Sequence, residues 1–113
     1  MLLTNLTWPA ISVPKETPVV IPIAAIEQHG HHLPLATDSM LLAEIVRRVE
    51  SAMTASILVT PLMWLGNSDH HLDFPGTLSA SPRTYFGYAG GVDGQLDHTW
   101  LSASIYSQWA RRQ

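Results

Sequence analysis

Two long apolar runs, each followed by a polar loop, dominate the pattern of the chain. The first run covers residues 18–26 and is almost wholly aliphatic, and the second covers residues 56–65. Runs of this kind are typical of strands that are buried on both faces, as in a parallel sheet covered by helices. Pro22 offers no backbone N–H, so we expect the first strand to lie at an edge or to be interrupted there.

A helix is predicted between these strands. It would begin at Thr37 or Asp38, either of which can cap the first turn, and end at about Met53. Its apolar residues recur at helical spacing, with charged residues on the opposite side. The apolar positions are Leu41, Leu42, Ile45, Val46 and Val49. The order strand, helix, strand predicts a right-handed βαβ unit and therefore an α/β sandwich.

After the second polar loop the pattern weakens. Ser81 and Pro82 are typical of a helix start, with Ser81 as the cap and Pro82 at the first helical position. Four glycines between residues 87 and 94 are poor helix material, so this helix is expected to degrade. A chain of 113 residues predicts a single domain, residues 1–113, in which residues 87–113 form a divergent tail.

Composition narrows the class of protein. Hydrophobic residues make up 46% of the chain and charged residues 13%, which favours a buried core over disorder. A net charge of −3 argues against nucleic acid or an anionic membrane surface as a partner. The absence of cysteine excludes disulfides, thiolate metal sites and cysteine nucleophiles. No segment reads as a signal peptide or a membrane span, so a soluble cytoplasmic protein is predicted.

The first polar loop is a candidate metal site. Glu27 and His29 are two residues apart at a strand end and would face the same side, and Asp38 returns near the start of the helix. Carboxylates and an imidazole suit Zn²⁺ or Mn²⁺, which would lower the pKa of a bound water. The alternative is a solvated loop whose histidines bond to the backbone. His31 and His32 are expected to be structural or to orient the ligands.

The second polar loop, residues 66–77, also follows an apolar strand. In open α/β sheets the ligand crevice lies beyond the carboxyl ends of the strands, so both loops are where a site is expected. Ser68 and His71 are the candidate catalytic residues, since they could contact a substrate carbonyl; alternatively they hold the loop. A Ser-His-Asp triad is disfavoured because no Gly-x-Ser-x-Gly elbow is present.

At these two loops the sequence resembles the creatininase (creatinine amidohydrolase) family. A Glu-x-His-Gly-x-His-Leu-Pro pattern closed by Asp is matched by Glu27, His29, Gly30, His32, Leu33, Pro34 and Asp38. A Gly-x-Ser-x-x-His-x-x-Phe-Pro-Gly-Thr pattern is matched by Gly66, Ser68, His71, Phe74, Pro75, Gly76 and Thr77. The resemblance covers about residues 1–86.

This resemblance implies a layered α/β/α sandwich with a mostly parallel sheet and a binuclear Zn or Mn centre. Glu27 and His29 would bind different ions, and Asp38 would bridge them. The implied reaction is hydrolysis of C–N bonds in amides, often cyclic, so a small-molecule amide is the expected substrate. A homo-oligomer, a hexamer in the family, is the expected assembly.

The family's remaining ligands, from an Asn-Gly-His motif and a later acidic residue, do not occur here in frame. Read one nucleotide out of frame, residues 99–113 permit a strand that ends in Asn-Gly-His. We hypothesise a frameshift between about Phe86 and Thr99, which would leave the fold incomplete at its C-terminus. The alternatives are a natural short paralogue, a catalytically inactive metal-binding or interaction fragment, and a plain α/β domain with histidine-rich loops.

Overall fold

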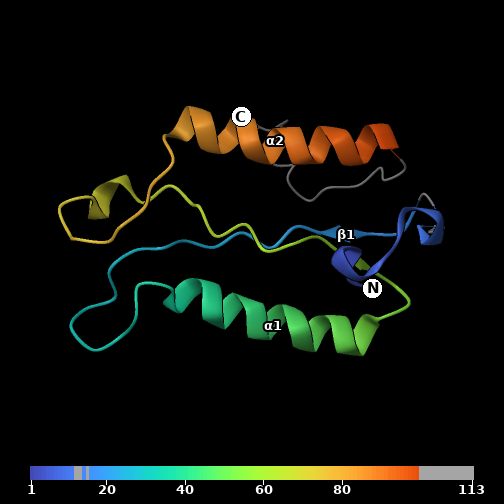
Figure 1. Cartoon of the computed structure of the whole chain (residues 1–113), viewed down its shortest axis with the longest axis horizontal. Helices are drawn as coiled ribbons and strands as arrows, with labels where there is room; N and C mark the ends of the chain where they lie inside the picture. The colour runs from blue at the N-terminus through green and yellow to red at the C-terminus, as the bar shows by residue number, and fades with distance from the viewer. Residues whose placement is uncertain (12–13, 15, 100–113) are drawn as a thin grey trace.

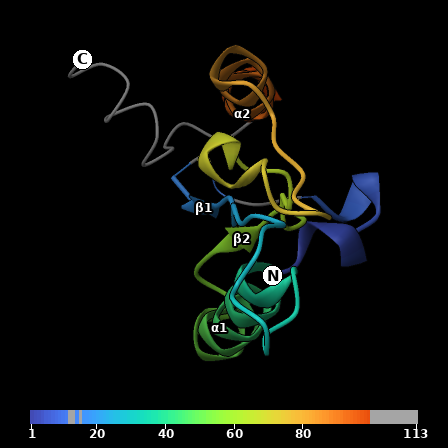
Figure 2. The same ribbon diagram turned by 90° about the vertical axis from the view of Figure 1, so that its left-hand side faces the viewer.

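Two helices enclose a pair of extended segments. The computed structural model describes residues 1–11, 14 and 16–99. The elements are 3-10 turns at Leu3–Asn5 and Trp8–Ala10, strand β1 (Val19–Val20), helix α1 (Thr37–Met53), strand β2 (Leu58–Val59), a 3-10 turn at Asp69–His71 and helix α2 (Pro82–Thr99). The segments that carry β1 and β2 run between α1 and α2 (Figure 1), and the view from the end shows the same three layers (Figure 2). The predicted α/β/α layering is confirmed.

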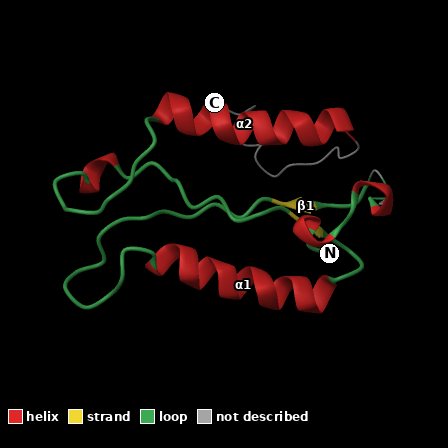
Figure 3. Cartoon of the chain, viewed as in Figure 1, coloured by secondary structure: helices red, strands yellow, loops and turns green. Residues whose placement is uncertain are grey.

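The two strands pair in parallel, as the predicted βαβ order requires. The paired positions are Val19 with Leu58 and Val20 with Val59. A regular ladder would next need an N–H from Pro22, which has none. Pairing resumes at an isolated bridge between Ile23 and Met63, where the register has slipped by one residue. The predicted interruption at Pro22 is confirmed, and most of both extended segments is loop rather than strand (Figure 3).

The first turn of α1 differs from its prediction. The residue that precedes the helix in the cap position is Ala36, which makes no side-chain cap bond. The hydroxyl of Thr37 instead donates to the carbonyl of Pro34 over 2.6 Å, and Asp38 lies within the first turn. The prediction that Thr37 or Asp38 caps the helix is therefore wrong, because the turn before the helix uses the threonine hydroxyl. The predicted end at Met53 is confirmed.

The apolar stripe of α1 is only partly covered. Leu41, Ile45 and Val49 remain 61%, 56% and 39% exposed, and no residue of α1 is buried. A hollow between α1 and the first extended segment is lined by apolar side chains from both. Burial of aliphatic side chains is favourable in proportion to the area removed from water. Covering this face of α1 with another apolar surface would therefore be favourable.

Helix α2 begins as predicted and ends later than predicted. The N–H of Thr84 donates to Oγ of Ser81 over 3.2 Å, which is the expected cap. The glycine-rich stretch does not end the helix, which continues to Thr99. Intrinsic propensity is a weak constraint that tertiary context overrides, and here Ala89 is buried at 4% exposure in the middle of that stretch. The out-of-frame motif proposed for the tail falls mainly on residues 100–113, which lie outside the described part of the chain.

The core gathers around β2. The buried apolar residues are Val19, Ile57, Leu58, Val59, Met63, Ala80 and Ala89. They come from both extended segments, from the stretch before α2 (Ala80) and from α2 itself (Ala89). Among the described residues, no helix has the length and apolar character needed to cross a membrane.

Candidate functional site

The two histidine-rich loops lie at the same end of the molecule. Residues 27–36 lead from the first extended segment to α1, and residues 66–77 follow the second segment (Figure 1, at the left). An antiparallel bridge joins Ile26 to Leu78, and the N–H of Leu78 donates to the carbonyl of Ile26 over 2.9 Å. The two loops that the sequence singled out therefore face each other beyond the strand ends, as expected for an open α/β sheet.

The structure brings together Glu27, His29 and Asp38. One donor atom from each of these side chains lies within 4.8 Å of the other two donor atoms, and all three residues are partly buried. His31 and His32 are exposed, and neither is part of a metal-ligand group among the described residues. The three predicted ligands thus form one cluster, which we call the first group.

Backbone hydrogen bonds close the loop that forms the first group. The N–H of Glu27 donates to the carbonyl of Leu35 over 3.1 Å, and Oγ of Ser39 donates to the carbonyl of Ala25 over 3.0 Å. Gly30 takes a φ of 72°, in the left-handed region that favours glycine. The first turn of α1 is consequently tied to the end of the extended segment, which is what returns its carboxylate to the loop.

The hydrogen bonds of His29 define which of its ring nitrogens is free. Nδ1 lies 2.9 Å from the carbonyl oxygen of Glu27, and because a carbonyl only accepts, Nδ1 carries the proton. In the neutral ring Nε2 holds a lone pair, and it lies 3.1 Å from Oδ1 of Asp38. The Glu27 carbonyl, followed by Asp38, raises the pKa of His29 above its ordinary value.

The first group has the donor chemistry of a divalent-cation site. Imidazoles that bind metals usually donate their other N–H to a carbonyl or carboxylate, as His29 does to Glu27. The free Nε2 and two carboxylates are ligands that Zn²⁺ and Mn²⁺ accept. Two acceptors facing each other at 3.1 Å, Nε2 of His29 and Oδ1 of Asp38, need a cation or a proton between them. The residues present therefore fit the metal that the sequence pattern implied.

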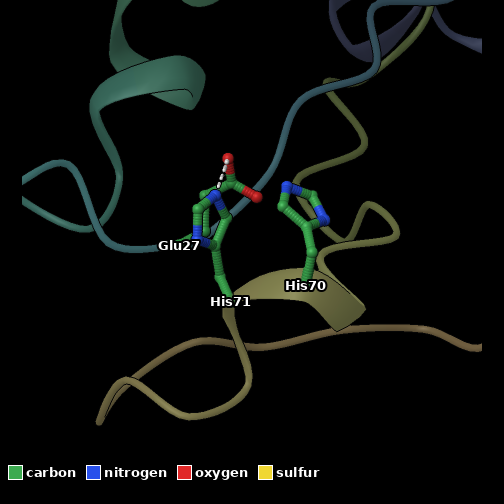
Figure 4. Close-up of side chains that lie close together, drawn as sticks. All are labelled: Glu27, His70 and His71. Carbon is green, nitrogen blue, oxygen red and sulfur yellow. Dashed lines mark ion pairs between the residues drawn. The ribbon is translucent and has the colours of Figure 1, made fainter.

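A second group of donors includes Glu27 as well. Glu27, His70 and His71 also place one donor atom each within 4.8 Å of one another (Figure 4). Nε2 of His71 lies 3.7 Å from Oε1 of Glu27, and the rings of His70 and His71 have centroids 4.1 Å apart. The 3-10 turn Asp69–His71 presents the two imidazoles from the second loop toward the carboxylate at the end of the first segment.

Ser68 directly precedes the 3-10 turn that carries these imidazoles. It has no exposed surface, and its Oγ has no hydrogen-bond partner among the described residues. Its backbone N–H donates to Oγ of Ser79 over 2.8 Å, and that hydroxyl donates to Oδ1 of Asp69 over 2.5 Å. Ser79, followed by Asn67, lowers the pKa of Asp69. These bonds fix the start of the second loop, while a role for Ser68 in catalysis stays a prediction.

Sequence reasoning did not select His70 or Gln28. His70 was readable as a second imidazole beside His71, but it falls at an unspecified position of the family pattern. Gln28 falls between two predicted ligands, and a glutamine in a polar loop gives no signal of its own. Only the fold shows that Gln28 reaches His71 across 43 residues of sequence.

Known proteins match this chain both in sequence and in fold. The model of the creatininase family, described as creatinine amidohydrolase, matches residues 4–97. The chain belongs to the creatininase family. The match extends beyond the resemblance expected for residues 1–86 and includes most of α2. A solved structure of a mutant creatininase complexed with creatine superposes with a TM-score of 0.78 at 25% identity, covering 88% of this chain and 41% of that one.

Relatives of known function in this family are longer than the chain. It is 35% identical over 80 residues to the mycofactocin precursor peptide peptidase of Mycobacterium ulcerans, covering 65% of this chain and 29% of the relative. Over 75 residues it is 27% identical to the 3-dehydro-scyllo-inosose hydrolase of Thermotoga maritima, covering 66% of this chain and 24% of the relative. The chain thus spans less than a third of the length of each of these relatives.

Proposed function

We propose that this chain carries a divalent-metal site of a creatininase-type amidohydrolase, with Glu27, His29 and Asp38 as ligands. The observation that carries the proposal is the 3.1 Å approach of the free Nε2 of His29 to a carboxylate oxygen of Asp38, with Glu27 alongside. A cation between these atoms removes the conflict between two acceptors. Three protein ligands also leave coordination positions open, as hydrolytic metal sites require.

The proposed reaction is hydrolysis of a C–N bond in a small amide. Zn²⁺ or Mn²⁺ bound to this group would lower the pKa of a bound water and polarise an amide carbonyl. The chain's own residues supply the ligands and, from the second loop, the imidazole of His71 beside Glu27. The two relatives and the solved creatininase support hydrolysis as the class of reaction, and the substrate of this chain is proposed only as an amide.

The second loop is proposed to contact the substrate. His71 is partly buried and lies 3.7 Å from the Glu27 carboxylate, so a molecule bound at the first group would meet its ring. Ser68 is proposed as a second contact, supported by a buried hydroxyl that has no partner among the described residues. An orphaned buried hydroxyl carries a free-energy cost unless a water or a ligand satisfies it.

Self-association and a cytoplasmic location complete the proposal. The exposed apolar stripe of α1 supports a homo-oligomer, since aliphatic surface of this kind is favourable to bury. A second candidate function is a metal-binding segment without turnover. The coverage favours this candidate, since the chain spans 41% of the solved creatininase with which it superposes.

Metal content measured by mass spectrometry tests the proposal. The purified chain is loaded with Zn²⁺ or Mn²⁺, dialysed and compared with His29→Ala, Glu27→Ala and His31→Ala. We expect His29→Ala and Glu27→Ala to lose the bound metal, because each removes a ligand of the first group. His31→Ala is the matched control, since it removes an exposed imidazole from the same loop.

The pattern of losses distinguishes the two donor groups. If His29→Ala keeps its metal while Glu27→Ala loses it, the cation is held by the second group and the proposal is wrong. Assays of the loaded chain with a set of small linear and cyclic amides, creatinine among them, then separate the enzyme from the metal-binding segment, since only the enzyme releases product.

A further inference from the structure

Gln28 connects the two loops through both ends of its side-chain amide. The N–H of Gly30 donates to Oε1 of Gln28 over 2.9 Å, so the oxygen end of the amide is identified by a donor that cannot accept. The nitrogen end, Nε2, consequently faces the second loop and lies 3.1 Å from Nδ1 of His71. The orientation of this amide is thus fixed by the backbone of the first loop.

The fixed amide determines where His71 carries its proton. An amide nitrogen only donates, so Nδ1 of His71 accepts and holds a lone pair. In the neutral ring the proton is therefore on Nε2, the atom that faces Glu27. His29 shows the opposite arrangement, with its proton on Nδ1 and its lone pair on Nε2. The two histidines near Glu27 are therefore opposite tautomers.

The distance to Glu27 leaves the His71 N–H available. Nε2 of His71 lies 3.7 Å from Oε1 of Glu27, which is longer than an N–H···O hydrogen bond. No hydrogen bond of this nitrogen is seen among the described residues. A metal ligand needs a lone pair on the nitrogen that faces the ion, and Nε2 of His71 lacks one in this tautomer. The donor atoms of the second group are therefore close enough to hold a cation, but His71 carries a proton on the nitrogen that would have to bind it.

We propose that Gln28 is a positioning residue that holds His71 in its Nε2–H tautomer. The proposal rests on the assignment of the cation to the first group. In this state His71 presents a hydrogen-bond donor beside Glu27, where it can donate to the carbonyl oxygen or the leaving nitrogen of a bound amide. The same proton on Nε2 also keeps the second group (Glu27, His70 and His71) from binding the cation in place of the first group.

The tautomer can be measured without any metal. In the ¹⁵N-labelled metal-free chain, long-range ¹H–¹⁵N correlations of the imidazoles report which ring nitrogen is protonated. We expect His71 to carry its proton on Nε2 and His29 on Nδ1. Gln28→Glu keeps an oxygen for the Gly30 N–H and places a second acceptor against Nδ1, so His71 is expected to move its proton to Nδ1. Gln28→Met removes both bonds and should leave a mixture of tautomers.

Metal stoichiometry gives an independent readout. Gln28→Glu frees the Nε2 lone pair of His71, so this variant is expected to bind a second equivalent of Zn²⁺ that the wild-type chain does not. Adding His71→Ala to Gln28→Glu should abolish the second equivalent; if it persists, the new carboxylate is itself the ligand and the proposal is overturned.

Either of two spectra also overturns the proposal: wild-type His71 protonated on Nδ1, or a Gln28→Glu variant whose His71 tautomer is unchanged. Circular dichroism confirms that each variant is folded before its spectrum is interpreted. The test is separate from that of the metal site, because a His29→Ala variant that keeps its metal would refute the proposed function and leave the measured tautomers of the metal-free chain as they are.

Discussion

His29 and Asp38 approach each other through two atoms that are both acceptors in the neutral state. Nε2 of His29 lies 3.1 Å from Oδ1 of Asp38, while the Nδ1 proton of the same ring is committed to the Glu27 carbonyl. Without a cation this contact favours the uptake of a second proton by the ring, which agrees with the raised pKa of His29. The pair is therefore arranged for a positive charge, and a proton and a metal ion are alternatives for it.

Replacing Asp38 with Asn should weaken metal binding without unfolding the chain. The amide can donate to the lone pair on Nε2 of His29, so the ring loses its function as a ligand, and we expect affinity for Zn²⁺ to fall by at least about tenfold. The lost negative charge in the first turn of α1 should cost about 0.3–1 kcal/mol. Titration calorimetry measures the first effect and thermal melting the second. Asp73→Asn, which removes an exposed carboxylate from the other loop, should change neither binding nor the fold.

Gly76→Ala should destabilise the turn that closes the second loop. Gly76 has a φ of 86°, and a Cβ there would collide with Cδ1 of Leu35 in the first loop. The left-handed conformation alone should cost about 1–2 kcal/mol for alanine. Gly87→Ala is the control, since Gly87 lies in α2 and an added methyl group there would meet nothing within 4 Å. It should stabilise the helix by about 0.8–1 kcal/mol. Equal melting temperatures for the two variants would contradict the expectation.

Ser79→Ala should destabilise the start of the second loop. The hydroxyl of Ser79 accepts from the buried N–H of Ser68 and donates to Asp69, so its loss leaves a buried donor unsatisfied, at a cost of about 1–3 kcal/mol. The pKa of Asp69 should rise toward its ordinary value, because Ser79 is the main cause of its lowering. Chemical denaturation and carboxyl NMR titration measure the two effects. Ser56→Ala, at an exposed position, should produce neither.

Glu44 should make the stability of the chain depend on pH in acid. Arg47, followed by Arg48, lowers the pKa of Glu44 from 4.5 to about 2 in the folded chain. A carboxyl with a lowered pKa contributes stability that is fully present above its unfolded value and lost as pH falls to the folded value. The loss should therefore fall between pH 4.5 and about 2. It should be small and salt-sensitive because the pair is exposed, and Glu44→Gln should remove it in acid melts.

The coding DNA tests the hypothesis for the tail. Read one nucleotide out of frame across residues 99–113, it should spell a strand that ends in Asn-Gly-His. Sequencing the region between the codons of Phe86 and Thr99 should locate the shift. A DNA sequence that does not encode this motif in that frame would refute the hypothesis and favour a natural short paralogue.

The sequence predicted the architecture because the strongest signals are local and periodic. The two apolar runs and the intervening helix to Met53 could be read directly, as could the interruption at Pro22. The C-terminal end of α2 could not be read from the sequence, since the low helix propensity of glycine is outweighed by the burial of residues such as Ala89. The cap of α1 could not be read either, because the Thr37 hydroxyl donates to the carbonyl of Pro34 in the preceding turn and is not free to cap the helix.

The candidate ligands could be chosen by type and spacing, but the proton positions could not. The convergence of Glu27, His29 and Asp38 follows from a loop whose two ends are held by a strand and a helix. The states of His29 and His71 depend on the Glu27 carbonyl and on the Gln28 amide. Such contacts are set by backbone direction in three dimensions, which residue spacing does not specify.

The one-residue slip at Pro22 has a consequence for the site as a whole. Side chains alternate between the two faces of an extended chain, so a single additional residue on one segment reverses the face to which everything after it points. The extra residue lies in the second segment between Val59 and Met63, upstream of the turn that carries His71. The break at Pro22 therefore shifts the register of the second segment by one residue relative to the first, before the chain enters the turn that carries His71.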